Sequence, residues 1–111
     1  MTVQTDALKE LYETVLQRKG KQVEGSYTCY LFKKGLDKIL KKCGEECSEV
    51  IIAAKNCDCV ETVMEISDLL YHLTVLMVEQ GISYEAVQAE LSKRSEKQGN
   101  LKTFHKVDKN T

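Results

Sequence analysis

The sequence predicts an all-α protein, a helical bundle of four main helices. Its 111 residues include no proline and only six glycines, so few residues break helices or form tight turns. Good helix formers such as Leu, Glu and Lys are frequent. Apolar residues recur every three or four positions along four segments, the spacing that places them on one helix face. Together these features favour helices over a β-sandwich or barrel.

The first predicted helix covers about residues 6–19. Its apolar positions repeat at helical spacing: Leu8, Leu11, Tyr12, Val15 and Leu16. After a loop, the second helix is predicted over about residues 29–55, with Ser26 or Thr28 as its N-cap. Gly35 lies inside this range, so we expect the helix to break or bend there.

The third predicted helix, about residues 60–80, is apolar on nearly all of its sides. Asp58 is its predicted N-cap and Gly81 ends it. A helix of this kind is expected at the centre of a bundle or at a subunit interface. A fourth helix is predicted to begin after Ser83 and to end near Gly99.

Length and charge limit the class of protein. The chain carries 17 acidic and 16 basic residues, a net charge of −1, so we expect no nucleic acid and no membrane as a partner. No apolar run reaches the roughly 18 residues that span a bilayer, and the N-terminus lacks a signal-peptide pattern. We therefore expect a cytoplasmic protein with one domain over residues 1–111, a core at about 6–99 and a polar tail at 100–111.

The five cysteines argue against a disulfide framework, because their number is odd and no secretory signal is present. Cys43 and Cys47 lie one turn apart and Cys57 and Cys59 follow nearby, which leaves a zinc site as an alternative. The first two share a helix face with apolar residues, and neither a C-x-x-C nor a paired His motif is present. We therefore interpret them as small apolar residues.

Two pairs of carboxylates have i, i+3 spacing: Glu46 and Glu49 in the second helix, and Glu65 and Asp68 in the third. Residues three apart lie on one side of a helix, so on two facing helices the four carboxylates would surround one point. Carboxylates that close need a cation or protons between them. Oxygen ligands in this number suit Mg²⁺ or Mn²⁺, so the sequence predicts a metal site.

Each pair also has a plainer interpretation. Glu46 and Glu49 could form a solvated helix face that pairs with neighbouring lysines. This explanation suits Glu65 and Asp68 less well, because they lie in the least polar helix of the chain. His72, one turn after Asp68, is interpreted as a core histidine hydrogen-bonded to a neighbour rather than as a metal ligand.

Basic residues lie close to the acidic pairs in the sequence. Lys34, Lys38 and Lys42 are predicted to contact substrate phosphates, and phosphate oxygens commonly complete the coordination of Mg²⁺. Glu45 or Glu46 is the predicted general base on an attacking water. These residue types indicate a metal-dependent hydrolase of a phosphoanhydride.

The order of these motifs resembles a known family. The run Glu45-Glu46-x-x-Glu49, followed by Glu65-x-x-Asp68, is similar to the motif of the all-α nucleoside triphosphate pyrophosphohydrolases, the MazG-like group. Within that group the chain most resembles the phosphoribosyl-ATP pyrophosphatase family of histidine biosynthesis, from about residue 8 to residue 99. The segments that carry this resemblance are Gly25-Ser26-Tyr27-Thr28, Leu31-Phe32, Lys34-Gly35, Lys38 to Lys42, Gly44-Glu45-Glu46, Glu49 to Lys55, Asp68 to Leu73 and Glu90-Leu91-x-x-Arg94.

The resemblance implies Mg²⁺-dependent hydrolysis of phosphoribosyl-ATP to phosphoribosyl-AMP and pyrophosphate, the second step of L-histidine biosynthesis. It implies that Glu46, Glu49, Glu65 and Asp68 hold the metal, with Glu45 in support. It also implies a homodimer whose paired helices complete the bundle, in a form not fused to the cyclohydrolase that acts next.

Two other functions stay open from the sequence. One is a house-cleaning pyrophosphatase for non-canonical (d)NTPs, with the same metal site and a different base pocket. The other is a small dimeric helical interaction module whose acidic residues have no catalytic role. Pyrophosphate release from phosphoribosyl-ATP and from a panel of dNTPs separates the histidine-pathway enzyme from the house-cleaning pyrophosphatase. Substitution of the acidic residues tests the interaction module.

Overall fold

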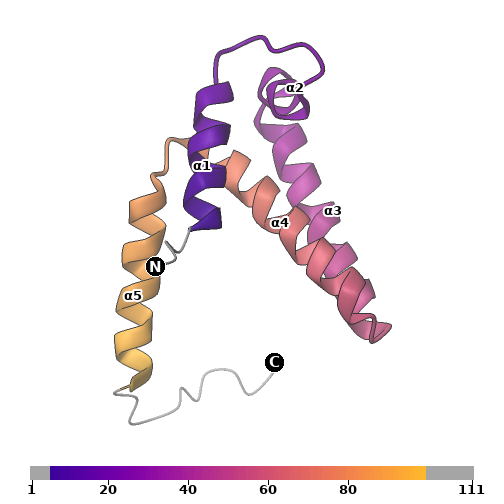
Figure 1. Ribbon diagram of the computed structural model, residues 1–111, viewed down its shortest axis with the longest axis vertical. Helices are drawn as coiled ribbons and strands as arrows, with labels where there is room; N and C mark the ends of the chain where they lie inside the picture. The colour runs from indigo at the N-terminus through magenta and orange to yellow at the C-terminus, as the bar shows by residue number, and fades with distance from the viewer. Residues whose placement is uncertain (1–5, 100–111) are drawn as a thin grey trace, which may run out of the picture.

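Five α-helices make up the structure, a computed structural model that describes residues 6–99, with side chains described up to residue 97. They are α1 Ala7–Arg18, α2 Tyr27–Lys34, α3 Leu36–Lys55, α4 Cys59–Gln80 and α5 Tyr84–Gly99 (Figure 1). No strand occurs among the described residues, so the all-α prediction is confirmed. The predicted polar tail at 100–111 lies outside this range.

The second predicted helix is two helices in the structure, because the backbone at Gly35 leaves the helical region. Its dihedral angles are φ 95° and ψ −174°, a conformation that is essentially restricted to glycine. The predicted break is therefore confirmed. The predicted start at residue 29 is two residues late, because Ser26 Oγ accepts a hydrogen bond from the Cys29 N–H (3.1 Å) and α2 begins at Tyr27.

Three further helix ends follow the predicted caps. Asp58 accepts a hydrogen bond from the Glu61 N–H (3.0 Å) at the start of α4. Gly81 adopts a left-handed conformation at the end of α4 (φ 72°), and Ser83 Oγ accepts from the Ala86 N–H (3.0 Å) at the start of α5. Local capping chemistry thus sets these boundaries.

The helices α3 and α4 run side by side in opposite directions and form the long arm of the molecule in Figure 1. The helices α1 and α2 pack on the C-terminal half of α4, where the core lies. The buried apolar residues of this core are Val15, Leu31, Ile39, Val75 and Val78. The core therefore holds α2 against the N-terminal end of α3 and the C-terminal half of α4.

Beyond its first turn, the helix α5 extends away from the other helices, apart from the α3–α4 pair (Figure 1). Its first residue anchors it: the Tyr84 hydroxyl donates a hydrogen bond to the Asp6 carboxylate, and the Tyr84 ring lies 6.2 Å from that of Tyr12. Val87 and Leu91 are exposed. Most of this helix therefore has no packing partner within the described part of the chain.

All five cysteines are free thiols. Cys43 packs against the core, whereas Cys47, Cys57 and Cys59 are exposed. Among residues 6–99, no helix combines the length and the apolar character that a bilayer crossing demands.

A candidate metal centre between α3 and α4

Three of the four predicted metal ligands converge between α3 and α4. Glu46 and Glu49 extend from α3 and Glu65 from α4, and one carboxylate oxygen of each lies within 4.8 Å of the other two. The i, i+3 spacing on α3 directs the first two side chains to the same side. The antiparallel packing of α4 brings the third carboxylate to the same point.

The surroundings of the three carboxylates disfavour a full negative charge on each of them. Glu46 is only 5% exposed, and Glu65 Oε1 is buried without a hydrogen-bond partner among the described residues. The pKa of Glu65 is raised to about 7, first by hydrogen bonding with the Glu61 carboxyl, then by burial and by the negative charge of Glu49. An orphaned oxygen among converging carboxylates fits a divalent cation that prefers oxygen ligands.

The fourth predicted ligand, Asp68, lies apart from this group of three. Its side chain is exposed, and its carboxylate is not among the converging oxygens. The main chain of Asp68 has a different role, because its carbonyl oxygen accepts a hydrogen bond from His72 Nδ1 (2.8 Å). The structure thus brings together three of the four acidic residues that the sequence analysis grouped.

Glu61 is an acidic residue of the site that the sequence analysis did not assign as a ligand. It lies one turn before Glu65 on α4, and the two carboxyl groups interact. A cavity of about 170 Å³ beside the carboxylates is lined by both residues, together with Glu49, Ile52, Ala53, Asn56 and Asp58. The signal for Glu61 was its i, i+4 spacing from Glu65 in a helix that is otherwise almost entirely apolar.

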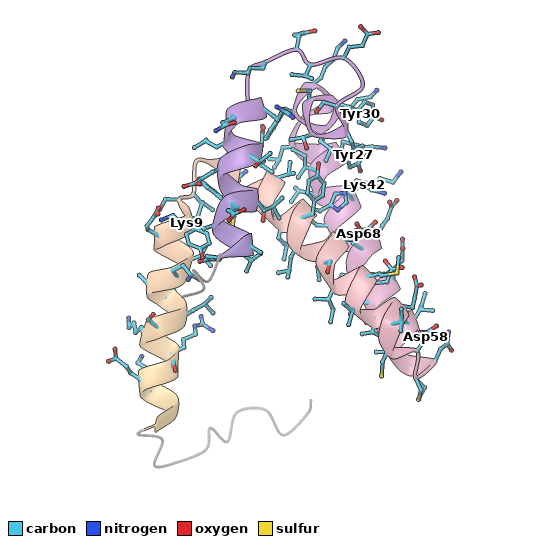
Figure 2. All side chains as sticks on the ribbon, in the orientation of Figure 1. Lys9, Tyr27, Tyr30, Lys42, Asp58 and Asp68 are labelled. Carbon is cyan, nitrogen blue, oxygen red and sulfur yellow. The ribbon has the colours of Figure 1, made fainter. Side chains whose placement is uncertain are left out.

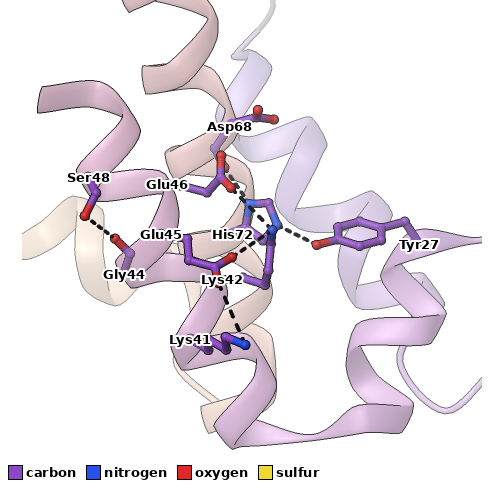
Figure 3. A network of polar contacts seen from close by, with 9 residues as sticks. All are labelled: Tyr27, Lys41, Lys42, Gly44, Glu45, Glu46, Ser48, Asp68 and His72. Carbon is purple, nitrogen blue, oxygen red and sulfur yellow. Dashed lines mark hydrogen bonds and ion pairs between the residues drawn. The ribbon is translucent and has the colours of Figure 1, made fainter. Parts of the chain in front are cut away.

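Lys42 lies at the edge of the carboxylate group (Figure 3). Its Nζ is 3.1 Å from Glu45 Oε1 and 3.6 Å from Glu46 Oε2. The hydrogen bond with Glu45 raises the pKa of Lys42 and lowers the pKa of Glu45, so both groups stay charged at neutral pH. Of the other predicted phosphate contacts, Lys38 is half-buried on α3, and Lys34 Nζ lies 5.9 Å from the centre of the Tyr30 ring.

His72 links the main chain of α4 at Asp68 to Tyr27 at the start of α2. It is buried, with Nδ1 bonded to the Asp68 carbonyl oxygen and Nε2 lying 3.0 Å from the Tyr27 hydroxyl (Figure 3). A carbonyl oxygen can only accept, so Nδ1 is the donor in the first of these two bonds. The interpretation of His72 as a hydrogen-bonded core histidine is confirmed.

Known proteins match the chain over most of its length. The family model described as Phosphoribosyl-ATP pyrophosphohydrolase matches residues 8–95. A phosphoribosyl-ATP pyrophosphatase of Clostridium botulinum (strain Kyoto / Type A2) is 55% identical over 102 residues, which are 92% of this chain and 93% of that protein.

Two further relatives carry the same name. The protein of Lacticaseibacillus casei (strain BL23) is 48% identical over 109 residues, covering 98% of this chain and 99% of the relative. That of Limosilactobacillus fermentum (strain NBRC 3956 / LMG 18251) is 60% identical over 87 residues, 78% of this chain and 82% of the relative. The model match and these identities lead to one conclusion: the chain belongs to the phosphoribosyl-ATP pyrophosphohydrolase family, a family of hydrolases.

Proposed function

We propose that this chain hydrolyses phosphoribosyl-ATP to phosphoribosyl-AMP and pyrophosphate in histidine biosynthesis, with Mg²⁺ as its cofactor. Family membership and the shared name of its relatives support this substrate and this bond. The single observation that carries the proposal is the convergence of three carboxylate oxygens within 4.8 Å, next to Lys42.

Glu46, Glu49 and Glu65 would hold Mg²⁺ or Mn²⁺, with Asp68 as a fourth ligand from one turn further along α4. Bound there, the metal would neutralise phosphate charge and activate a water for attack on phosphorus. Carboxylate oxygens suit these ions, and the buried oxygen of Glu65 lacks another partner among the described residues. Both observations support this ligand set.

The protein side chains then hold the phosphates and accept a proton. Lys34, Lys38 and Lys42 supply positive charge for the phosphate groups, and Glu46 accepts the proton of the attacking water. Glu45 is a weak proton acceptor, because its bond to Lys42 lowers its pKa. We therefore assign Glu45 to the positioning of Lys42, which lies 3.1 Å from it.

The proposed enzyme is a cytoplasmic homodimer. Exposed apolar residues along α4 support the dimer, because a lone helix of this character leaves much apolar area in water. The residues of this apolar stripe are Val63, Ile66, Leu70 and Leu73, between 37% and 64% exposed. Five free thiols are in keeping with a reducing compartment.

The test is an assay of pyrophosphate release with Mg²⁺ present, from phosphoribosyl-ATP and from a panel of canonical and non-canonical dNTPs. We expect turnover of phosphoribosyl-ATP and little turnover of the dNTPs. Glu49→Gln is expected to lower kcat/KM by at least about 100-fold. Loss of a residue that only contacts a metal ligand already costs up to about 100-fold, and Glu49 is itself a proposed ligand. Glu13→Gln, an exposed carboxylate on α1, is the matched control and should retain full activity.

Preferential turnover of the dNTPs would replace this substrate with a house-cleaning role for the same metal site. Full activity of the Glu49→Gln variant, with Mg²⁺ binding unchanged in calorimetry, would overturn the assignment of the carboxylates themselves.

A further inference from the structure

Two exposed tyrosine rings lie at the start of α2. Tyr27 is 43% exposed and Tyr30 is 41% exposed. Their ring centres are 6.0 Å apart and their planes differ by 23°, so the rings are stacked. A stacked aromatic pair that stays open to solvent offers a flat apolar surface to a planar ligand.

This aromatic pair adjoins the carboxylate group. The Tyr27 hydroxyl lies 3.0 Å from Nε2 of His72, one turn after Asp68 on α4. Burial raises the pKa of Tyr27, and the charges of Lys42 and Glu46 act on the same hydroxyl. In Figure 2 Asp68, Lys42, Tyr27 and Tyr30 follow one another along the same side of the molecule. The rings therefore extend the candidate metal centre towards α2.

A lysine adjoins Tyr30, the second ring of the pair. Lys34 follows Tyr30 by one helical turn, and its Nζ is 5.9 Å from the centre of the Tyr30 ring. The site thus presents three chemistries in order: carboxylates with Lys42, then two stacked rings, then a second ammonium group.

This order matches the chemical order of the substrate under the proposed function, on which the inference rests. Phosphoribosyl-ATP has a triphosphate at one end, an adenine in the middle and a ribose phosphate attached to the adenine at the other end. We propose that the adenine stacks on Tyr27 and Tyr30, and that Lys34 binds the phosphate of the added ribose. Lys34 then selects against ordinary nucleoside triphosphates, which have no phosphate beyond the base.

The stacking is tested by calorimetry with the full-length protein and Mg²⁺, using phosphoribosyl-AMP, AMP and pyrophosphate as separate ligands. Tyr30→Ala should weaken the binding of both nucleotides by about tenfold, a typical effect of losing one aromatic stacking partner. Pyrophosphate binding should not change, because it reports the metal centre alone. Tyr30→Phe keeps the ring and should bind both nucleotides like the unsubstituted protein.

The role of Lys34 is tested by comparing the two nucleotides in one variant. Lys34→Gln should weaken phosphoribosyl-AMP about tenfold, in line with the loss of a charge-assisted hydrogen bond, and should leave AMP unchanged. Lys93→Gln is the matched control, because this exposed lysine lies on α5, a helix that is well apart from α2 (Figure 1).

Either of two results would overturn the inference: nucleotide binding that is unaffected by Tyr30→Ala, or Lys34→Gln affecting AMP and phosphoribosyl-AMP alike. Absence of nucleotide binding by the unsubstituted protein would also overturn it. These measurements need no turnover, so failure of the hydrolysis assay is seen separately. Far-ultraviolet circular dichroism verifies that each variant keeps its helices.

Discussion

At the scale of one residue, Glu65 shows that a negative charge in the candidate metal centre is unfavourable without a cation or a proton. It lies on α4, the most apolar of the five helices, with one carboxylate oxygen buried and without a partner among residues 6–97. Its pKa is raised to about 7 by Glu61, by burial and by Glu49. The folded protein therefore binds a proton at Glu65 more tightly than the unfolded chain does, unless a cation takes that place.

This shift predicts a pH-dependent stability in EDTA. The proton taken up on folding adds stability in full below the ordinary pKa of 4.5, and this stability is lost as the pH rises through about 7. Glu65→Gln removes the charge, so at pH 8 this variant should be more stable than the unsubstituted protein. The gain should shrink towards pH 4 in urea denaturation curves.

Magnesium supplies the complementary measurement. Mg²⁺ at pH 8 should raise the urea midpoint of the unsubstituted protein, because it binds the folded state, and should have little effect on Glu65→Gln. Glu13→Gln should respond like the unsubstituted protein in both series. A stability difference between Glu65→Gln and the unsubstituted protein that does not vary with pH would contradict the explanation.

At the scale of the helices, one glycine interrupts the α2–α3 segment and another lies within its second helix. Gly35 separates α2 from α3 with φ 95° and ψ −174°, whereas Gly44 lies inside α3. A Cβ atom added at either position would meet no atom within 4 Å. The backbone conformation alone therefore decides what a substitution does.

We predict that Gly35→Ala lowers the free energy of unfolding by about 1–3 kcal/mol, because a side chain strains this backbone region. Gly44→Ala should raise it by roughly 0.5–1 kcal/mol, the helix-propensity difference between the two residues. Urea denaturation measures both. The expectation fails if the two alanine variants change stability in the same direction.

At the scale of the whole molecule, the described part of the chain is more extended than a compact domain. Its radius of gyration is 17.0 Å, whereas a compact domain of this length has about 13 Å. The helices α3 and α4 form one arm and α5 another, with apolar residues exposed on both (Figure 1). Surfaces of this kind are expected to be covered by a second copy in the proposed homodimer.

The dimer predicts a light-scattering mass of twice 12.6 kDa. Val63→Lys places a charge on the apolar stripe of α4, at a residue that is 64% exposed within one chain. It should therefore shift the mass towards that of a monomer without unfolding the helices. Val23→Lys, on the segment between α1 and α2, is the control and should stay dimeric. A monomeric unsubstituted protein at micromolar concentration would refute the proposed dimer.

The sequence by itself determined the helices, their caps and the residue types of the candidate site. Ser26, Asp58 and Ser83 cap through side chains close in the sequence, and Gly35 breaks the helix through its own backbone. Because Glu46 and Glu49 are one turn apart, their shared side of α3 also follows from local spacing. Their role as metal ligands stays a prediction.

Only the tertiary structure decided which side chains of different helices meet. On α4, Glu61 and Asp68 are seven residues apart, so they lie on nearly the same face, about 20° apart around the axis and about 10 Å apart along it. The position of α3 along α4 therefore decides which of them lies near the carboxylates, and Glu61 is the one whose carboxyl group interacts with Glu65. Likewise, the seating of α2 on α4 aligns Tyr27 with His72. Periodicity describes each helix relative to its own axis, whereas these contacts depend on how side-chain packing rotates and shifts one axis against another.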